Sequence, residues 1–171
     1  MKGKIITYYG NGEGKTMAAI GHAIRIVGHK RKAAIIQFMK GRKNTGEYNF
    51  LKNMKNIEIY LCGAPEFLKG EEFREEHYEK VKQGLEIAKK ILRQQKIDLL
   101  ILDEILYAIR FRLVDEKKVL DLLDGREKVN IILTGRNPGR EILRRSDIIT
   151  EIKEVKHHYK KDKETIPGMD Y

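Results

Sequence analysis

A glycine-rich loop, GNGEGKT at residues 10–16, constrains the fold of this chain more than any other feature. It follows a short apolar run and precedes a run with helical spacing, which is the context of a phosphate-binding loop. The usual loop has four residues between its first glycine and its Gly-Lys-Thr. Here Gly10 and Gly14 are separated by only three residues, and Tyr9 occupies the position of the first glycine. We therefore expect a nucleotide phosphate site on a contracted loop.

Each kind of residue in the loop has an expected role. The glycines let the backbone approach a phosphate and turn N–H groups toward it, and the following helix adds the positive end of its dipole. Lys15 supplies a positive charge, and the hydroxyl of Thr16 suits magnesium. The alternative is a glycine-rich turn capped by Thr16, which spacing, context and composition disfavour. The predicted nucleotide-binding residues of the loop are Gly10, Asn11, Gly12, Glu13, Gly14, Lys15 and Thr16.

Apolar runs rich in β-branched residues and leucine alternate with helical patterns along the whole chain. Near-continuous runs such as IDLLILDE are typical of strands buried on both faces of a parallel sheet. The alternation predicts a doubly wound α/β fold with right-handed crossovers. The expected strands are Lys4–Tyr8, Lys32–Met39, Ile57–Leu61, Ile97–Leu102, Val129–Thr134 and Asp147–Val155. The expected helices are Lys15–Val27, Glu72–Gln95, Asp115–Leu123 and Pro138–Arg145. Two stretches are expected to be irregular, Lys40–Asn49 and Cys62–Gly70.

Two further motifs stand at strand ends, where ligands bind in open α/β sheets. LLILDE ends in Asp103 and Glu104, which we expect to meet the magnesium held by Thr16. Glu104 could instead orient a water, or both acids could merely cap the strand. Arg136, in the TGR that follows VNIIL, is placed to bond phosphate oxygens, unless it is a surface arginine in a turn.

Composition narrows the class of protein. With 171 residues the chain is expected to form one domain, residues 1–171. Its formal net charge of +10 favours anionic partners, although acidic and basic residues are interleaved as on an ordinary solvated surface. No motif indicates specific nucleic-acid binding, and no apolar run has the length of a membrane span. Cys62 is the only cysteine, so a cytoplasmic location is the default expectation, and no zinc-ligand spacing is present.

Taken in order, these segments resemble the ATP:corrinoid adenosyltransferases of vitamin B12 synthesis and salvage. The resemblance rests on GNGEGKT, AAIGHAIRIVGHK, IIQFMKG, LDE, LTGR and the terminal DIITEIKEVKHHY…PGMDY, and it covers about Lys4 to Tyr171. It implies a P-loop, RecA-like fold: a doubly wound, mostly parallel sheet of about six strands with helices on both faces. It also implies a homodimer and an electron-donating reductase, such as a flavoprotein, as partners.

The resemblance implies alkyl transfer, with ATP as co-substrate and a corrinoid as substrate. Co(I) attacks the ribose 5′ carbon and triphosphate leaves, so the protein aligns the reactants and stabilises the leaving group. Lys15 and Arg136 are the expected catalytic residues, with Mg²⁺ held by Thr16, Asp103 and Glu104. Family members bind the corrinoid over an aromatic side chain that replaces its lower ligand, and Phe67 resembles that residue; alternatively Phe67 is an ordinary core residue.

This chain departs from the family pattern in several places. Glu13 stands where many family loops carry lysine, and Met17 stands where they carry a second threonine. The chain has no tryptophan, and only three residues precede the first expected strand, so we expect no N-terminal helix over the corrin. Other readings left open are a conventional P-loop ATPase or kinase, and a regulatory protein that binds nucleotide or corrinoid without turnover.

Overall fold

A computed structural model describes residues 1–64, 73–157, 166 and 168–169 of the chain. In these residues six strands form one sheet in the order β3-β2-β4-β5-β1-β6, and every pair of neighbours is parallel. The strands are β1 Ile5–Tyr9, β2 Ala33–Phe38, β3 Ile57–Cys62, β4 Leu99–Asp103, β5 Asn130–Gly135 and β6 Ile148–Glu151. The expected α/β fold with a parallel sheet of about six strands is confirmed.

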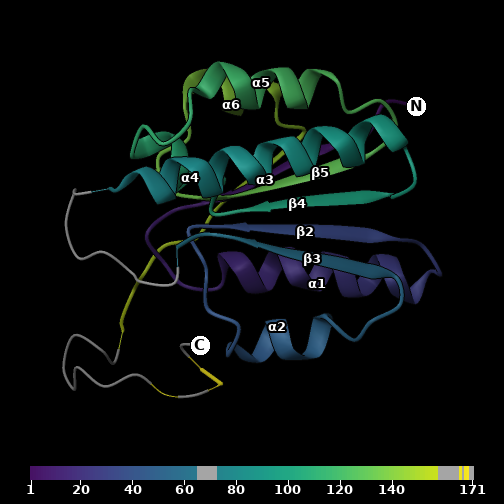
Figure 1. The fold of residues 1–171 in the computed structure, drawn as a ribbon, viewed down its shortest axis with the longest axis horizontal. Helices are drawn as coiled ribbons and strands as arrows, with labels where there is room; N and C mark the ends of the chain where they lie inside the picture. Colours follow the sequence, from purple (N-terminus) through teal and green to yellow (C-terminus); the bar gives the residue numbers. More distant parts are fainter. Residues whose placement is uncertain (65–72, 158–165, 167, 170–171) are drawn as a thin grey trace.

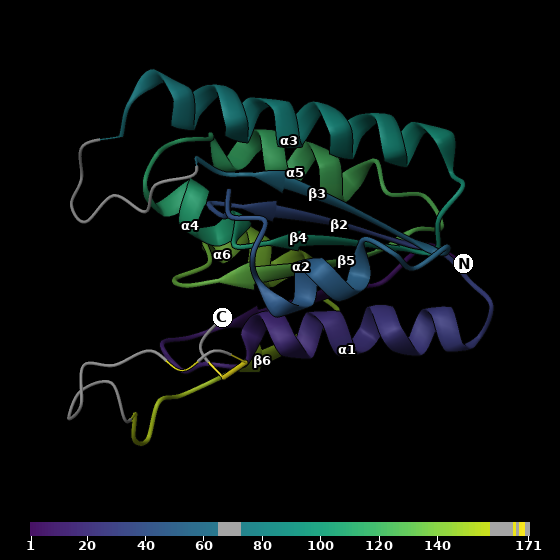
Figure 2. The ribbon, with the colours of Figure 1, turned by 60° about the horizontal axis from the view of Figure 1, so that its bottom comes forward.

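Helices cover both faces of the sheet (Figures 1 and 2). The helices are α1 Lys15–Gly28, α2 Gly46–Leu51, α3 Glu75–Gln94, α4 Ile105–Arg110, α5 Glu116–Asp124 and α6 Arg140–Arg145. Figure 1 shows α1 and α2 below the sheet, and α3, α4, α5 and α6 above it. No helix among the described residues has the length and apolarity needed to cross a bilayer.

The core is divided by the sheet into two layers, and β4 shows why its sequence is continuously apolar. Leu100 and Leu102 pack on the face covered by α3, α4 and α5, whereas Leu99 and Ile101 pack on the face covered by α1. All four are at most 2% exposed. Burying a side chain of this size stabilises a fold by about 1.5–3 kcal/mol, so the central strands are held from both sides.

Two short helices, α2 and α4, were not predicted from the sequence. The stretch Lys40–Asn49, expected to be irregular, contains the start of α2, and α4 begins only two residues after β4. Both helices have six residues, and neither has a side-chain hydrogen bond at its N-cap. The last strand, expected to reach Val155, ends at Glu151.

Strand register brings the predicted site residues to one edge of the sheet. Tyr9 at the end of β1 pairs with Gly135 at the end of β5, and Asp103 at the end of β4 pairs with Gln37 in β2. The loop at residues 10–14, Asp103 and Arg136 therefore all follow strand C-termini, where parallel sheets bind ligands.

Candidate nucleotide site

The glycine loop is fixed by backbone close to it on one side. Gly10 has φ +125°, and a Cβ there would lie 2.2 Å from the carbonyl oxygen of Ile152. A Cβ on Gly12 would lie 2.7 Å from the carbonyl carbon of Lys153. No other residue type fits these positions without backbone movement. The contraction of the loop is thus accompanied by close packing against the segment after β6.

Two loop amides are used to anchor the loop. The N–H of Gly10 donates to the carbonyl of Gly135 at 3.2 Å, and that of Gly12 donates to the carbonyl of Ile152 at 2.9 Å. Gly14, in the left-handed region with φ +98°, is the N-cap of α1. The first turn of a helix leaves its N–H groups without intrahelical partners. The amides at the end of the loop and the start of α1 are therefore the ones that could donate to an anion.

Lys15 curls back over the loop. Its Nζ donates a hydrogen bond to the carbonyl oxygen of Gly12. Burial, and then the positive charge of Arg136, lower the pKa of Lys15, while Glu104 and Asp103 oppose that shift. The lysine is thus held at the mouth of the loop among charges of both signs.

A hydrogen-bonded network joins the loop to the ends of β4 and β5. The hydroxyl of Thr16 donates to Asp103 Oδ1 at 3.0 Å, and the hydroxyl of Thr134 donates to the same oxygen at 2.7 Å. The N–H of Glu104 donates to Thr134 Oγ1 at 2.7 Å. Asp103 is 1% exposed. The structure thus brings Thr16 and Asp103 into direct contact. Sequence reasoning missed Thr134, although it stands in the LTGR motif.

Glu104 has an unusual backbone and an unusual side-chain environment. Its φ of +61° places it in the left-handed region at the junction between β4 and α4. Burial, and then the adjacent charge of Asp103, raise the pKa of Glu104 to about 7. A carboxyl group in this state can hold a proton near neutral pH when metal and nucleotide are absent.

Lys40 enters the same cluster and was not predicted as a site residue. Its Nζ lies 3.1 Å from Asp103 Oδ2, 3.2 Å from Thr16 Oγ1 and 4.0 Å from Glu47 Oε1. Burial works to lower the pKa of Lys40, but Asp103 and Glu104 outweigh it and raise the pKa above its ordinary value. The lysine is therefore a cation in contact with two of the three expected metal ligands, Thr16 and Asp103. Its only sequence signal was its place after β2, within IIQFMKG.

Arg136 braces the loop from the end of β5. Its Nη2 donates to the carbonyl oxygen of Asn11 at 3.2 Å, and its guanidinium lies 5.8 Å from the ring centroid of Tyr107. The Nε atom is buried and has no hydrogen-bond partner among the described residues. Arg136 also borders a cavity lined by Tyr9, Gly10, Asn11, Arg110, Asn137, Glu151, Lys153 and Glu154.

The remaining predicted residues have different outcomes. Asn11 accepts a hydrogen bond from the N–H of Glu154 at 3.1 Å, so its side chain faces the segment after β6. Glu13 hydrogen-bonds with His157. Phe67 lies outside the described residues.

The donor set fits a magnesium ion shared with a nucleotide better than a metal held by protein alone. Among the described residues no group of three His, Cys, Asp or Glu side chains could hold a metal. Thr16 and Asp103, however, offer a hydroxyl and a carboxylate within 3.0 Å of each other. Mg²⁺ commonly uses one or two such protein ligands and completes its shell with phosphate oxygens and water.

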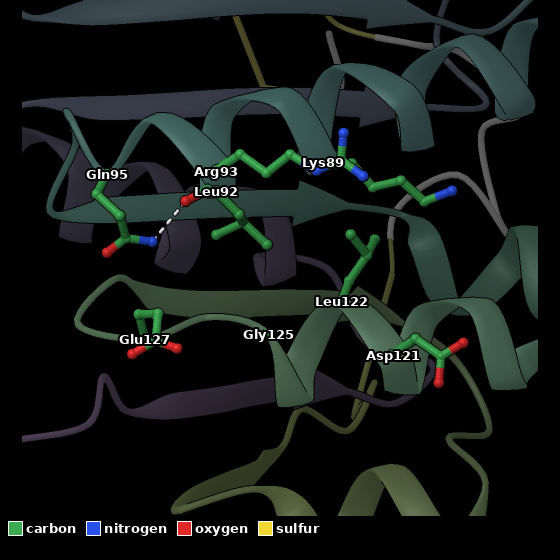
Figure 3. A pocket seen from close by; sticks show the side chains of 8 residues that line it. All are labelled: Lys89, Leu92, Arg93, Gln95, Asp121, Leu122, Gly125 and Glu127. Atoms are coloured by element: carbon green, nitrogen blue, oxygen red, sulfur yellow. Dashed lines mark hydrogen bonds between the residues drawn. The ribbon is translucent and has the colours of Figure 1, made fainter.

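Another cavity lies away from this edge, between α3 and α5 (Figure 3). It is lined by Lys89, Leu92, Arg93, Gln95, Asp121, Leu122, Gly125 and Glu127. None of these residues belongs to the nucleotide site described above. Charged side chains of both signs and the apolar side chains of Leu92 and Leu122 line this cavity.

Comparisons with known proteins point to one family. The chain matches the family described as ATP:corrinoid adenosyltransferase BtuR/CobO/CobP over residues 1–171. It is 33% identical to the corrinoid adenosyltransferase of Escherichia coli K12, over 99% of this chain and 86% of that protein. It is 32% identical to the corrinoid adenosyltransferase CobA of Salmonella typhimurium over the same shares, and 26% identical to a Pseudomonas aeruginosa enzyme of the same description, over 99% of this chain and 84% of that protein.

Proposed function

This chain belongs to the ATP:corrinoid adenosyltransferase family and is an enzyme that transfers an adenosyl group from ATP to a corrinoid. We propose that the transferred group is 5′-deoxyadenosyl, that the acceptor is the Co(I) form of the corrinoid, and that inorganic triphosphate leaves. The observation that supports this most strongly is the direct contact between Thr16 and Asp103 beside Lys15, at the start of α1. That arrangement suits a triphosphate with its metal.

The proposed reaction does not require a side chain that acts as a general base. The cobalt supplies the electron pair of the new bond to C5′, the C5′–O bond breaks, and triphosphate carries away the bonding electrons. Because the nucleophile needs no deprotonation, the protein acts by orienting the reactants and by stabilising the negative charge of the leaving group. Lys15, whose Nζ donates to the carbonyl of Gly12, and the first-turn amides of α1 would perform that second task.

Mg²⁺ would be held by Thr16 and Asp103, with Glu104 close by, and would neutralise part of the triphosphate charge. Glu104 fits this role less directly, because its backbone rather than its side chain is tied into the network by Thr134. Asp103 is fixed from two sides by the hydroxyls of Thr16 and Thr134. These contacts hold one carboxylate oxygen in place before a ligand arrives.

Arg136 would bind the triphosphate from the β5 side. Its Nη2 contacts the carbonyl of Asn11, and its buried Nε has no partner in the described part of the chain, which leaves donor capacity for a phosphate oxygen. Phe67 would lie under the corrin in place of the lower axial ligand. A homodimer, an electron-donating reductase and a cytoplasmic location complete the proposal.

A direct test is to incubate the protein with MgATP and a chemically reduced corrinoid, and to measure the cobalt–carbon product and the phosphate species released. We expect adenosylated corrinoid and triphosphate in equal amounts. Lys15→Met should lower the rate by at least about 100-fold, as expected for loss of a group that stabilises the leaving charge. Lys128→Met removes the same charge from an exposed turn before β5 and should leave the rate unchanged.

Two outcomes would contradict the proposal. Orthophosphate release that does not depend on corrinoid would favour a conventional ATPase in which Glu104 orients water, a role compatible with its raised pKa. Binding of both substrates without any product would favour a regulatory protein. In either case Lys15 and Thr16 would still bind nucleotide, so nucleotide affinity alone does not test the transfer.

A further inference from the structure

The ammonium of Lys40 lies between the two side chains that we assign to magnesium. It is 3.1 Å from Asp103 Oδ2 and 3.2 Å from Thr16 Oγ1. An ammonium donates hydrogen bonds and accepts none, so each contact uses a lone pair that a metal ion would need. The hydroxyl hydrogen of Thr16 is directed to Asp103 Oδ1, which leaves its oxygen lone pairs facing Lys40.

The remaining oxygen atoms of the cluster are also engaged. Asp103 Oδ2 accepts a second hydrogen bond, at 3.3 Å, from Nε2 of Gln37. Asp103 Oδ1 accepts from both threonine hydroxyls. The buried carboxylate is therefore fully hydrogen-bonded and charge-paired without any metal. A divalent ion must remove Lys40 from this position to reach the same oxygens, because two cations cannot share it.

The backbone next to Lys40 is fixed by contacts with the segment after β3. The carbonyl of Lys40 accepts from the N–H of Gly63 at 3.1 Å, and a Cβ on Gly63 would lie 2.2 Å from the Lys40 nitrogen. The segment after β2 is thus held against the segment after β3. Nζ stands on a four-carbon stem with several rotatable bonds, so it can move by several ångströms while the backbone stays in place.

We propose that Lys40 is a positioning residue that occupies the metal position of the nucleotide-free enzyme and withdraws when magnesium arrives with a triphosphate. The triphosphate supplies both extra metal ligands and a negative charge to which the displaced ammonium can turn, and Glu47 lies beside it as a second acceptor. A free divalent metal ion supplies neither the additional ligands nor the negative charge. Lys40 therefore makes metal binding depend on nucleotide. This inference rests on the proposed assignment of Thr16 and Asp103 as metal ligands.

The experiment measures metal binding to nucleotide-free protein, with Mn²⁺ as the probe and its electron paramagnetic resonance signal as the readout. Wild-type protein should bind Mn²⁺ weakly, and Lys40→Met should bind it at least tenfold more tightly. Lys40→Gln serves as a second neutral variant of different shape, and Lys40→Arg keeps the charge and should remain like wild type. Lys43→Met removes a charge from the exposed part of the same loop and should change nothing.

Thermal unfolding gives an independent readout. Mg²⁺ without nucleotide should raise the melting temperature of Lys40→Met and Lys40→Gln but not that of wild type, because a ligand stabilises only the state that binds it. Equal Mn²⁺ affinity in wild type and both neutral variants would overturn the proposal. Failure of adenosyl transfer alongside the expected gain in Mn²⁺ affinity would instead contradict the proposed function and leave the role of Lys40 standing.

Discussion

Glu13 and His157 share a hydrogen bond of 2.5 Å between Oε1 and Nε2, although 144 residues separate them in the chain. The contact supplies a physical reason for an acid in the loop. The side chain of Glu13 contacts the segment that follows β6. The backbone of the same segment makes two more hydrogen bonds with the loop. The carbonyl of Ile152 accepts from the N–H of Gly12, and the N–H of Glu154 donates to Oδ1 of Asn11. Glu13 therefore helps to hold the loop against its neighbour.

A double-mutant cycle between Glu13→Gln and His157→Gln should reveal this coupling. Glu13 is 62% exposed in its side chain, so we expect a coupling free energy of about 0.3–1 kcal/mol, as for other exposed pairs. The free energy of unfolding of the two single variants and the double variant, measured in urea, gives the value. Strictly additive effects would show that the contact contributes nothing to stability.

The second prediction concerns the pH dependence of stability through Glu104. Its pKa is raised above the value of an unfolded glutamate, so the folded protein binds the proton more tightly than the unfolded chain does. The stabilisation from that proton is complete below about pH 4.5 and is lost as the pH rises through about 7. Glu104→Gln has no ionisable group at this position, so its stability should not fall over this pH range for the same reason. In metal-free, nucleotide-free protein, the variant should become more stable than wild type by on the order of 2–3 kcal/mol at pH 8.

Urea unfolding of both proteins between pH 5 and pH 8 measures this difference. The advantage of Glu104→Gln should grow steadily with pH and should be smallest at the acid end. An advantage that does not change with pH would mean that the carboxyl group is not titrating in this range. Glu86→Gln is a suitable control, because the pKa of Glu86 is lowered by its hydrogen bond to Lys89, in the opposite direction.

Much of the fold followed from local pattern. The apolar runs located all six strands. In β2, β4 and β5 the run is continuous because these strands are buried on both faces and so show no polar alternation. The stripe of Val81, Leu85, Ala88 and Leu92 on α3 is buried as its spacing predicts. α2 and α4 were missed, and each has only six residues, few for a helical period to be visible; α6 has the same length but was predicted within the longer stretch Pro138–Arg145. In α4 the apolar residues also continue directly from β4.

The site was predictable only where its residues carry a known motif. Lys15, Thr16 and Asp103 stand in sequence patterns whose geometry is shared by many phosphate sites. The contacts of Lys40 with Asp103 and of Glu13 with His157 join residues 63 and 144 positions apart. No local pattern encodes such pairings. They depend on strand order and on where the segment after β6 runs.

The third prediction tests the hydrogen-bonded network around Asp103, a proposed metal ligand. Thr134→Val removes the hydroxyl that donates to buried Asp103 and accepts from the N–H of Glu104. Leaving a buried charged group and an amide without this partner should lower the free energy of unfolding by about 1–3 kcal/mol. Thr150→Val, the same change on exposed edge strand β6, should alter it by less than about 0.5 kcal/mol. Equal effects of the two changes would contradict the network.

The last prediction compares two glycines in different surroundings. Gly135 has φ +140°, and a Cβ there would lie 2.6 Å from the Cβ of Leu106 in α4. Gly135→Ala adds steric overlap to a backbone conformation that side chains disfavour, so the free energy of unfolding should fall by about 2–4 kcal/mol. Gly21 lies inside α1 with open space where its Cβ would be. Gly21→Ala should raise the free energy of unfolding by about 0.5–1 kcal/mol, since alanine favours the helix.

Urea unfolding measures both values, and a tolerated alanine at position 135 would show that the end of β5 can move away from α4. Such movement would also shift Arg136, so adenosyl transfer by that variant would then report whether Arg136 must stay beside the loop.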